Sequence, residues 1–240
     1  MWFTVSCILE GIEGNGERKE EEECHPPQRH GFHEMIWVLA NINNMFTEQK
    51  FNIPALTGIS AKNIEEHLKL YAGYVKHANL IQTKIKDLLS QKEVDMYTFG
   101  ELNRRFGFEF DGMRNHEVYF KHFEGGATAL SEESSLHKAI TKQWGSLDSF
   151  MIAFKALAST RGPGWAMLYV DSVTKELVTT WVDEQHLGQL VGAAPVLALD
   201  CWEHAFAFDY QPSGRKVYIE DFFKNLNWNH PCELYEAARK

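Results

Sequence analysis

The sequence is poor in cysteine and in positive charge, and it has no long apolar run. Its four cysteines show no spacing typical of a disulfide framework, which favours a reducing compartment; they are Cys7, Cys24, Cys201 and Cys232. The 24 Lys and Arg are outnumbered by 33 Asp and Glu, and the resulting net charge of −9 argues against general nucleic-acid binding. No apolar stretch approaches the ~20 residues that cross a membrane. Residues 1–9 are apolar but lack a basic leading region, so we expect no secretory signal and a cytoplasmic protein with neither nucleic acid nor membrane as a partner.

The first 44 residues differ in character from the rest of the chain. Residues 17–23 form a charged run, two prolines follow at 26–27, and residues 35–45 could form a short helix. We therefore predict a poorly ordered extension over residues 1–44. A metal cluster in this extension is an alternative, but the spacing fits no familiar zinc pattern and a flexible polar segment is the better interpretation; the residues concerned are Cys24, His25, His30 and His33.

Two long helices are predicted in the next part of the chain, which we take as a helical-hairpin domain over residues 45–128. Ser60 is a suitable N-cap for the first helix, which should run to about Ser90. The second helix should run from about 97 to 123, with a break near 108–111. One face of the first helix carries apolar and aromatic residues at helical spacing: Ile64, His67, Tyr71, Tyr74, Ala78, Ile81 and Ile85.

The remaining residues, 129–240, read as an α/β C-terminal domain that mixes helices and strands. Runs of helix and runs of strand, rather than strict alternation, indicate an α+β fold. We expect a long antiparallel helical hairpin followed by a mixed domain with a three-stranded antiparallel sheet and helices. The expected strands are 165–171, 177–182 and 196–200, and the expected helices are 132–143, 147–160, 203–209, 217–226 and 231–238.

A possible metal half-site stands at the end of the last predicted strand. Asp200 and His204 are four residues apart, which places both side chains on one side of a single helical turn. A carboxylate and an imidazole that converge there suit a metal such as Mn, Fe or Zn. On spacing alone, an Asp that caps a helix and a His that packs in the core explain the pattern equally well.

The wider pattern resembles the iron/manganese superoxide dismutase family from about Phe51 to Lys240. The segment Asp200-Cys-Trp-Glu-His204 is similar to the family motif that supplies the third and fourth metal ligands. Shorter matches occur in the same order along the chain, at 59–67, at 115–116, at 162–165 and at 227–228.

The resemblance implies a superoxide dismutase with one Mn or Fe ion per subunit. The implied metal ligands are His67, His116, Asp200 and His204, and a bound solvent would complete the site. Such an enzyme converts superoxide to dioxygen and hydrogen peroxide by cycling the metal between two oxidation states. Zinc has no redox chemistry and could not serve.

The resemblance also implies residues that surround the metal. A Gln usually hydrogen-bonds the bound solvent, and Gln185 is the candidate because Gly112 stands where the other half of the chain would supply it. This arrangement favours manganese. A cambialistic site, which works with either Mn or Fe, is an alternative. His186 is the fallback for this role, and a surface position for Gln185 stays open. Trp165, Tyr119 and Trp202 would form a hydrophobic cage.

The substrate funnel departs from the family pattern. The His and Tyr that the family commonly places four and eight residues after the first ligand are here Tyr71 and Val75. Tyr71 is therefore the candidate for the gateway hydroxyl when the family pattern is matched without a gap, and Tyr74 is the alternative. The net negative charge opposes an anionic substrate at long range, and a local basic funnel could overcome it; its candidates are Lys69, Lys76, Arg114 and Arg215.

The resemblance implies a homodimer in which Glu203 reaches a ligand of the partner subunit; a plain surface position is the alternative. Two other functions remain as hypotheses. A mononuclear iron oxygenase would normally use two His and one carboxylate, so a third His argues against it. A non-catalytic superoxide-dismutase-like assembly subunit would have no need for an intact set of ligands.

Overall fold

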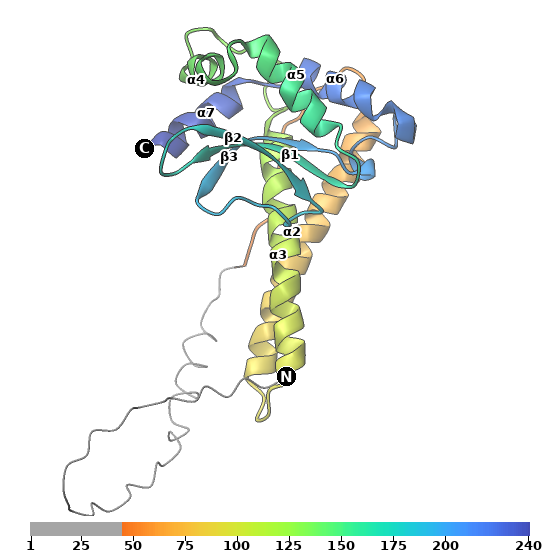
Figure 1. Ribbon diagram of the computed structural model, residues 1–240. Helices are drawn as coiled ribbons and strands as arrows, with labels where there is room; N and C mark the ends of the chain where they lie inside the picture. Colours follow the sequence, from red (N-terminus) through yellow and green to blue (C-terminus); the bar gives the residue numbers. More distant parts are fainter. Residues whose placement is uncertain (1–44) are drawn as a thin grey trace, which may run out of the picture.

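The computed structural model describes residues 45–240. The extension predicted over 1–44, with its suggested helix and its Cys and His residues, lies outside the described residues. Figure 1 shows a long helical hairpin that projects from a domain of helices and strands, as the α+β pattern predicts. In residues 45–240, no helix has the length and apolar character that a membrane span needs.

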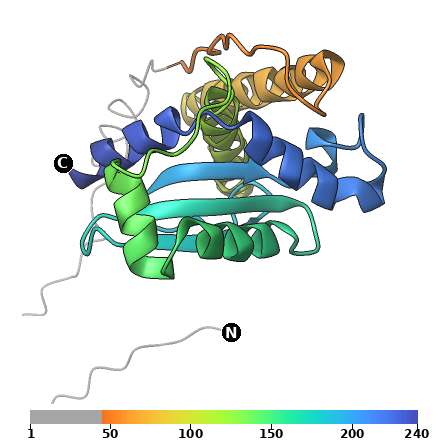
Figure 2. The same cartoon turned by 90° about the horizontal axis from the view of Figure 1, so that it is seen from above.

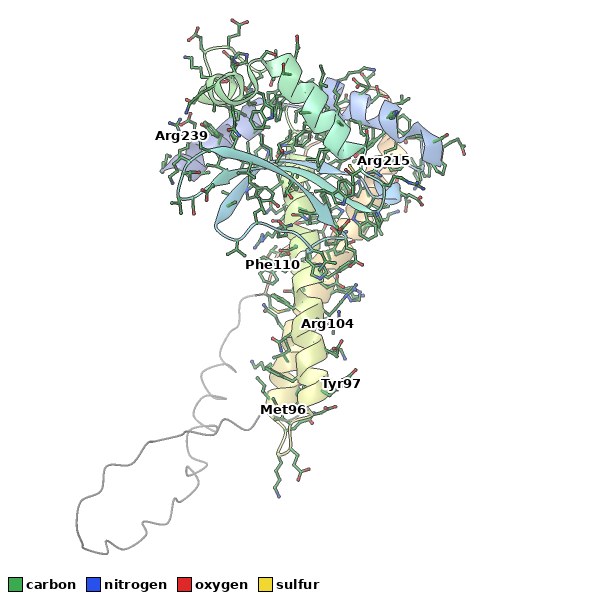
Figure 3. All side chains as sticks on the ribbon, in the orientation of Figure 1. Met96, Tyr97, Arg104, Phe110, Arg215 and Arg239 are labelled. Atoms are coloured by element: carbon green, nitrogen blue, oxygen red, sulfur yellow. The ribbon has the colours of Figure 1, made fainter. Side chains whose placement is uncertain are left out.

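The hairpin consists of α2 (Ala61–Leu89) and α3 (Met96–Lys121), which pack against each other in opposite directions. Ser60 caps α2, since its side chain accepts a hydrogen bond from the backbone N–H of Asn63. Figure 3 shows Met96 and Tyr97 near the far tip of the hairpin.

The break predicted near 108–111 is wrong, because α3 runs through this region without interruption. The aromatic side chains there pack on each other and on the chain before α2. The ring of Phe110 lies 5.7 Å from that of Phe106 and 5.6 Å from that of Phe46. These contacts stabilise a helix whose sequence pattern, with Gly107 and Gly112, suggests an interruption.

The sheet contains β1 (Gly164–Asp171), β2 (Leu177–Asp183) and β3 (Ala193–Asp200) in the order β2-β1-β3, all antiparallel. β3 begins three residues earlier than the sequence predicts, and it includes Pro195. A proline can occupy this position because β3 is an edge strand, and the register shifts beside it between Leu168 and Tyr169.

The other helices lie on the side of the sheet away from the tip of the hairpin, as Figure 1 shows, and Figure 2 shows the same elements from above. They are α4 (Ser135–Trp144), α5 (Leu147–Ala158), α6 (Arg215–Asn225) and α7 (Asn229–Arg239), and the chain also forms the short 3₁₀ turns η1 (Glu203–Ala205) and η2 (Pro212–Gly214). β3 also contacts α3 and α7, so the strand that ends at Asp200 lies against the hairpin.

The helix predicted at 203–209 is wrong, since only the 3₁₀ turn η1 forms there. A local hydrogen bond explains the difference. The carboxylate of Asp200 accepts from the backbone N–H of Trp202 at 2.8 Å, which satisfies a donor in the turn that follows the strand. This tight turn brings His204 back beside Asp200.

Candidate metal centre

Four side chains from four separate elements converge beside the hairpin. His67 comes from α2, His116 from α3, Asp200 from the end of β3 and His204 from η1. One nitrogen or oxygen atom of each lies within 4.8 Å of all the others. The structure thus brings together all four of the ligands that the sequence suggests.

The three imidazoles surround a single carboxylate oxygen. The Nε2 atoms of His67 and His204 each lie 3.1 Å from Oδ2 of Asp200, and Nε2 of His116 lies 3.5 Å from the same oxygen. His67, His116 and Asp200 are completely buried, whereas His204 is partly exposed. The site is therefore closed on the side of the hairpin and reaches solvent beside η1.

The tautomer of His116 is set by its contact with the backbone. Its Nδ1 lies 2.6 Å from the carbonyl oxygen of Gly112, which can only accept, so Nδ1 carries the proton. The lone pair is then on Nε2, which is buried without a hydrogen-bond partner among the described residues. Such an orphaned acceptor, aimed at a carboxylate and two other imidazoles, fits a cation at their centre.

Burial sets the protonation of these groups. Loss of hydration lowers the pKa of His116 to about 3 and also lowers the pKa of His67, so both rings are neutral at physiological pH. Burial alone would raise the pKa of Asp200, but the neighbouring His204 and His67 outweigh it and hold that pKa below its usual range. Three imidazoles and one carboxylate suit Mn, Fe or another first-row metal.

A chain of hydrogen bonds runs beside the four donors. The indole Nε1 of Trp165 donates to Oε1 of Gln185 at 2.9 Å, and Nε2 of Gln185 donates to the hydroxyl of Tyr74 at 2.9 Å. The rings of Trp165 and Tyr74 each lie 5.0 Å from the ring of His116. Gln185 is completely buried, whereas His186 packs edge-on against Phe108.

The two tyrosines proposed for the gateway occupy different surroundings. Tyr74 reaches Gln185, as described above. The hydroxyl of Tyr71 instead donates to Glu117 at 3.1 Å and accepts from the backbone N–H of Gln49 at 2.8 Å. Tyr71 therefore anchors the segment before α2 to the hairpin, and of the two residues Tyr74 is the one in the hydrogen-bonded chain next to His116.

Aromatic rings enclose the donors. The Trp202 ring stacks on His204 with 5.5 Å between centroids, and the Tyr119 ring lies 5.1 Å from that of His67. The sequence does not single out Phe120, although its ring lies 4.9 Å from that of His67. Its position four residues after His116, on the same helix face, is a signal that could have identified it.

A second contribution that the sequence does not reveal comes from α6. The hydroxyl of Tyr218 donates to the backbone oxygen of Asp200 at 2.9 Å. Because a hydroxyl donates only once, the Tyr119 hydroxyl, 3.0 Å away, must donate to Tyr218. Both residues are completely buried, so they hold the end of β3 firmly against the hairpin.

The proposed basic funnel is only partly free of acidic partners. Lys69 pairs with Glu65 and Arg114 pairs with Glu117. Arg215 donates to the backbone oxygen of Gly162, and two of its other nitrogens, Nε and Nη2, are buried without a partner among the described residues. The remaining candidate, Lys76, and the predicted interface residue Glu203 are both exposed.

This fold and this donor set define a mononuclear transition-metal protein with ligands from both a helical hairpin and an α+β domain. Residues 132–233 match the family model of the C-terminal domain of iron/manganese superoxide dismutases. The chain is 35% identical over 190 residues to a superoxide dismutase [Fe] of Aquifex aeolicus, which covers 77% of this chain and 88% of that protein.

Other relatives carry different metals in their names. A superoxide dismutase [Mn/Fe] of Aeropyrum pernix is 31% identical over 178 residues, 72% of this chain and 80% of that protein. A superoxide dismutase [Mn] of Mycolicibacterium paratuberculosis is 31% identical over 175 residues, 72% of this chain and 82% of that protein. The chain belongs to the iron/manganese superoxide dismutase family.

Proposed function

We propose that the protein converts superoxide to dioxygen and hydrogen peroxide at one Mn or Fe ion. His67, His116, Asp200 and His204 would hold the ion through Nε2 and Oδ2. The observation that carries the proposal is the convergence of these four donor atoms, within 4.8 Å of one another, in a largely buried site. When bound, the metal supplies a one-electron couple that accepts an electron from one superoxide and returns it to a second.

Several residues keep the donors in place before any substrate arrives. The Gly112 carbonyl fixes the tautomer of His116, and the Trp202 N–H holds Oδ1 of Asp200. Tyr218 holds the Asp200 backbone. Preorganised ligands of this kind avoid rearrangement when the charge of the site changes, and the aromatic rings around them exclude bulk water.

Proton supply is the proposed role of the Trp165–Gln185–Tyr74 chain. Trp165 can only donate, so its contact with Oε1 of Gln185 turns the amide nitrogen toward Tyr74. The Tyr74 hydroxyl thus accepts from Gln185 and keeps its own proton. Burial raises the pKa of Tyr74, so the hydroxyl keeps this proton at physiological pH and can present it as a hydrogen-bond donor.

We further propose manganese as the preferred ion, with iron able to replace it. The support is that Gln185 comes from the second half of the chain while Gly112 occupies the alternative position, and that relatives are named for Fe, for Mn and for both. A homodimer, with the exposed Glu203 carboxylate oriented toward His204 of the partner subunit, and a cytoplasmic location complete the proposal.

Metal analysis of the purified protein, with activity assayed after separate reloading with Mn or Fe, tests this function. We expect about one metal ion per subunit and rapid superoxide removal with at least one of the two ions. A protein that binds the ion but removes superoxide no faster than the free metal salt would favour the assembly subunit. The oxygenase hypothesis has less support, because a fourth protein ligand leaves less room for a bound substrate and dioxygen.

A further inference from the structure

The loop that carries Gln185 lies between β2 and β3 and is attached to the hairpin by the side chain of Gln189. Nε2 of Gln189 donates to Oδ1 of Asn115 at 3.1 Å and to the backbone oxygen of Gln185 at 3.2 Å. Nδ2 of Asn115 donates to the same backbone oxygen at 3.0 Å. Two side-chain amides therefore hold one carbonyl group, which belongs to Gln185, the residue that donates to the hydroxyl of Tyr74.

The orientation of the Gln189 amide is fixed from the opposite side. The hydroxyl of Tyr169, in β1, donates to Oε1 of Gln189. An oxygen that accepts from Tyr169 leaves the NH₂ group facing Asn115 and the Gln185 carbonyl, so each polar atom of both amides has a partner. Such a fully satisfied network favours one conformation over its alternatives.

The network joins three elements next to the metal site. Tyr169 lies in the sheet, Asn115 directly precedes the ligand His116 in α3, and Gln189 lies in the loop. The side chain of Gln185 is held by Trp165 and Tyr74, and its backbone is held by Asn115 and Gln189. No contact of Gln189 with the four metal donors is seen, so any effect of this residue on them must pass through Gln185 or Asn115.

We propose that Gln189 is a positioning residue that fixes Gln185 and thereby tunes the reduction potential of the metal site. The proposal rests on the proposed function, specifically on the role given there to Gln185. Removing Gln189 should allow the loop to shift, so that the Gln185 amide lengthens its contacts with Trp165 and Tyr74. Residues that orient the surroundings of a metal typically change activity or affinity by roughly 10–100-fold when they are lost.

The experiment compares Gln189→Glu and Gln189→Leu with the wild-type protein, all loaded with the same metal. Gln189→Glu keeps the shape but places a carboxylate oxygen against two acceptors, Asn115 Oδ1 and the Gln185 carbonyl. We expect a shifted midpoint potential and about a tenfold loss of activity at full metal content in both variants. Tyr169→Phe, which removes only the orienting hydroxyl, should shift the potential in the same direction by a smaller amount.

Gln143 provides a matched control far from the metal. Its Nε2 donates to the backbone oxygen of Leu177 at 2.5 Å, and its Oε1 accepts from the backbone N–H of the same residue at 3.1 Å. Gln143→Leu therefore also removes an amide that bridges to backbone, and it should lower the melting temperature while leaving the potential unchanged. Gln189 variants that behave like this control, with a lower melting temperature and an unchanged potential, would overturn the proposal.

A Gln185→Leu variant tests the role of Gln185 separately from that of Gln189. If Gln185→Leu shifts the potential and Gln189→Glu does not, Gln189 has no positioning role and the proposed function stands. If Gln185→Leu leaves both potential and activity unchanged, the role of Gln185 is wrong and the Gln189 proposal falls with it. Since the potential is measured without superoxide, it is informative even if the loaded protein is not a dismutase.

Discussion

Gly112 leaves the space that the ring of Tyr74 occupies. A Cβ atom at position 112 would lie 2.5 Å from Cδ1 of Tyr74, well inside van der Waals contact. The missing side chain lets the tyrosine of α2 lie against α3, where its hydroxyl reaches Gln185. A glycine within a helix costs about 0.5–1 kcal/mol relative to alanine, so this close packing has an energetic cost that the contact must offset.

Gly112→Ala should destabilise the fold and disturb the site together. Overpacking of this kind typically costs about 1–3 kcal/mol, which exceeds the gain in helix propensity. The displaced ring of Tyr74 would lose its contact with Gln185, so activity should fall as well. Urea unfolding and an activity assay measure the two effects.

Gly100→Ala is the control for this substitution. Gly100 lies in the same helix, and a Cβ there would meet nothing within 4 Å. We expect it to stabilise the protein by about 0.5–1 kcal/mol without changing activity. Equal stabilisation by both substitutions would show that Tyr74 does not need the space at Gly112.

Tyr74→Phe and Tyr71→Phe should have opposite effects. Tyr74→Phe removes the hydroxyl next to Gln185 and should slow turnover by about tenfold with little change in stability. Tyr71→Phe leaves the Gln49 N–H without its partner and removes one of the two partners of the Glu117 carboxylate, which keeps Arg114; this should cost about 1–3 kcal/mol of stability with activity retained. Steady-state rates and unfolding free energies distinguish the pair, and the reverse pattern would make Tyr71 the gateway residue.

His116→Ala separates catalysis from assembly. The substitution removes one of the four donors, so metal content and superoxide removal should both be lost. The oligomeric state, measured by light scattering, should stay the same, because His116 is buried beside Trp165 inside the subunit. A variant that retains full activity would contradict the proposed ligand set.

Stability should fall in mild acid because of a buried histidine pair. Nδ1 of His122 and Nδ1 of His230 lie 2.9 Å apart. On the other side of its ring, Nε2 of His122 accepts a hydrogen bond of 3.2 Å from the backbone N–H of Ala198. His122 must therefore carry its proton on Nδ1 and donate it to His230, so both rings are neutral. An added proton would break one of these two hydrogen bonds.

Burial lowers the pKa of His122 well below its usual value, and burial followed by the charge of Lys121 lowers the pKa of His230 to about 4. As the pH falls, these two imidazoles therefore bind protons first in the unfolded chain, near the ordinary histidine pKa of about 6.5. The stability due to the pair is complete above that pH and is lost as the pH falls from about 6.5 toward 4. Unfolding midpoints at pH 7 and pH 5 should differ less in His230→Leu than in the wild type at the same metal content; equal differences would contradict the prediction.

Sequence patterns locate the metal donors well because the constraint on them is local. His67 and His116 are implied by segments that resemble the family, and the four-residue spacing of Asp200 and His204 becomes decisive only together with such a motif. The role that we propose for Tyr74 rather than Tyr71 could not be derived in this way. It depends on space left by Gly112 in another helix, and residue order in α2 carries no record of it.

The same limit explains the break wrongly predicted in the second helix. The uninterrupted α3 depends on aromatic packing with Phe46, a residue more than 50 positions earlier than the predicted break. The role proposed for Gln189 depends on Asn115 and Tyr169, which come from two other elements. Contacts between distant segments decide these features, whereas periodicity and caps report only on local structure.

Anomalous diffraction from crystals of the metal-loaded protein, recorded at the Mn or Fe absorption edge, tests the central claim most directly. We predict one strong peak per subunit, at bonding distance from Nε2 of His67, His116 and His204 and from Oδ2 of Asp200. A peak at any other position, or a loaded protein without a peak between these four atoms, would contradict the assignment of the metal site and the function built on it.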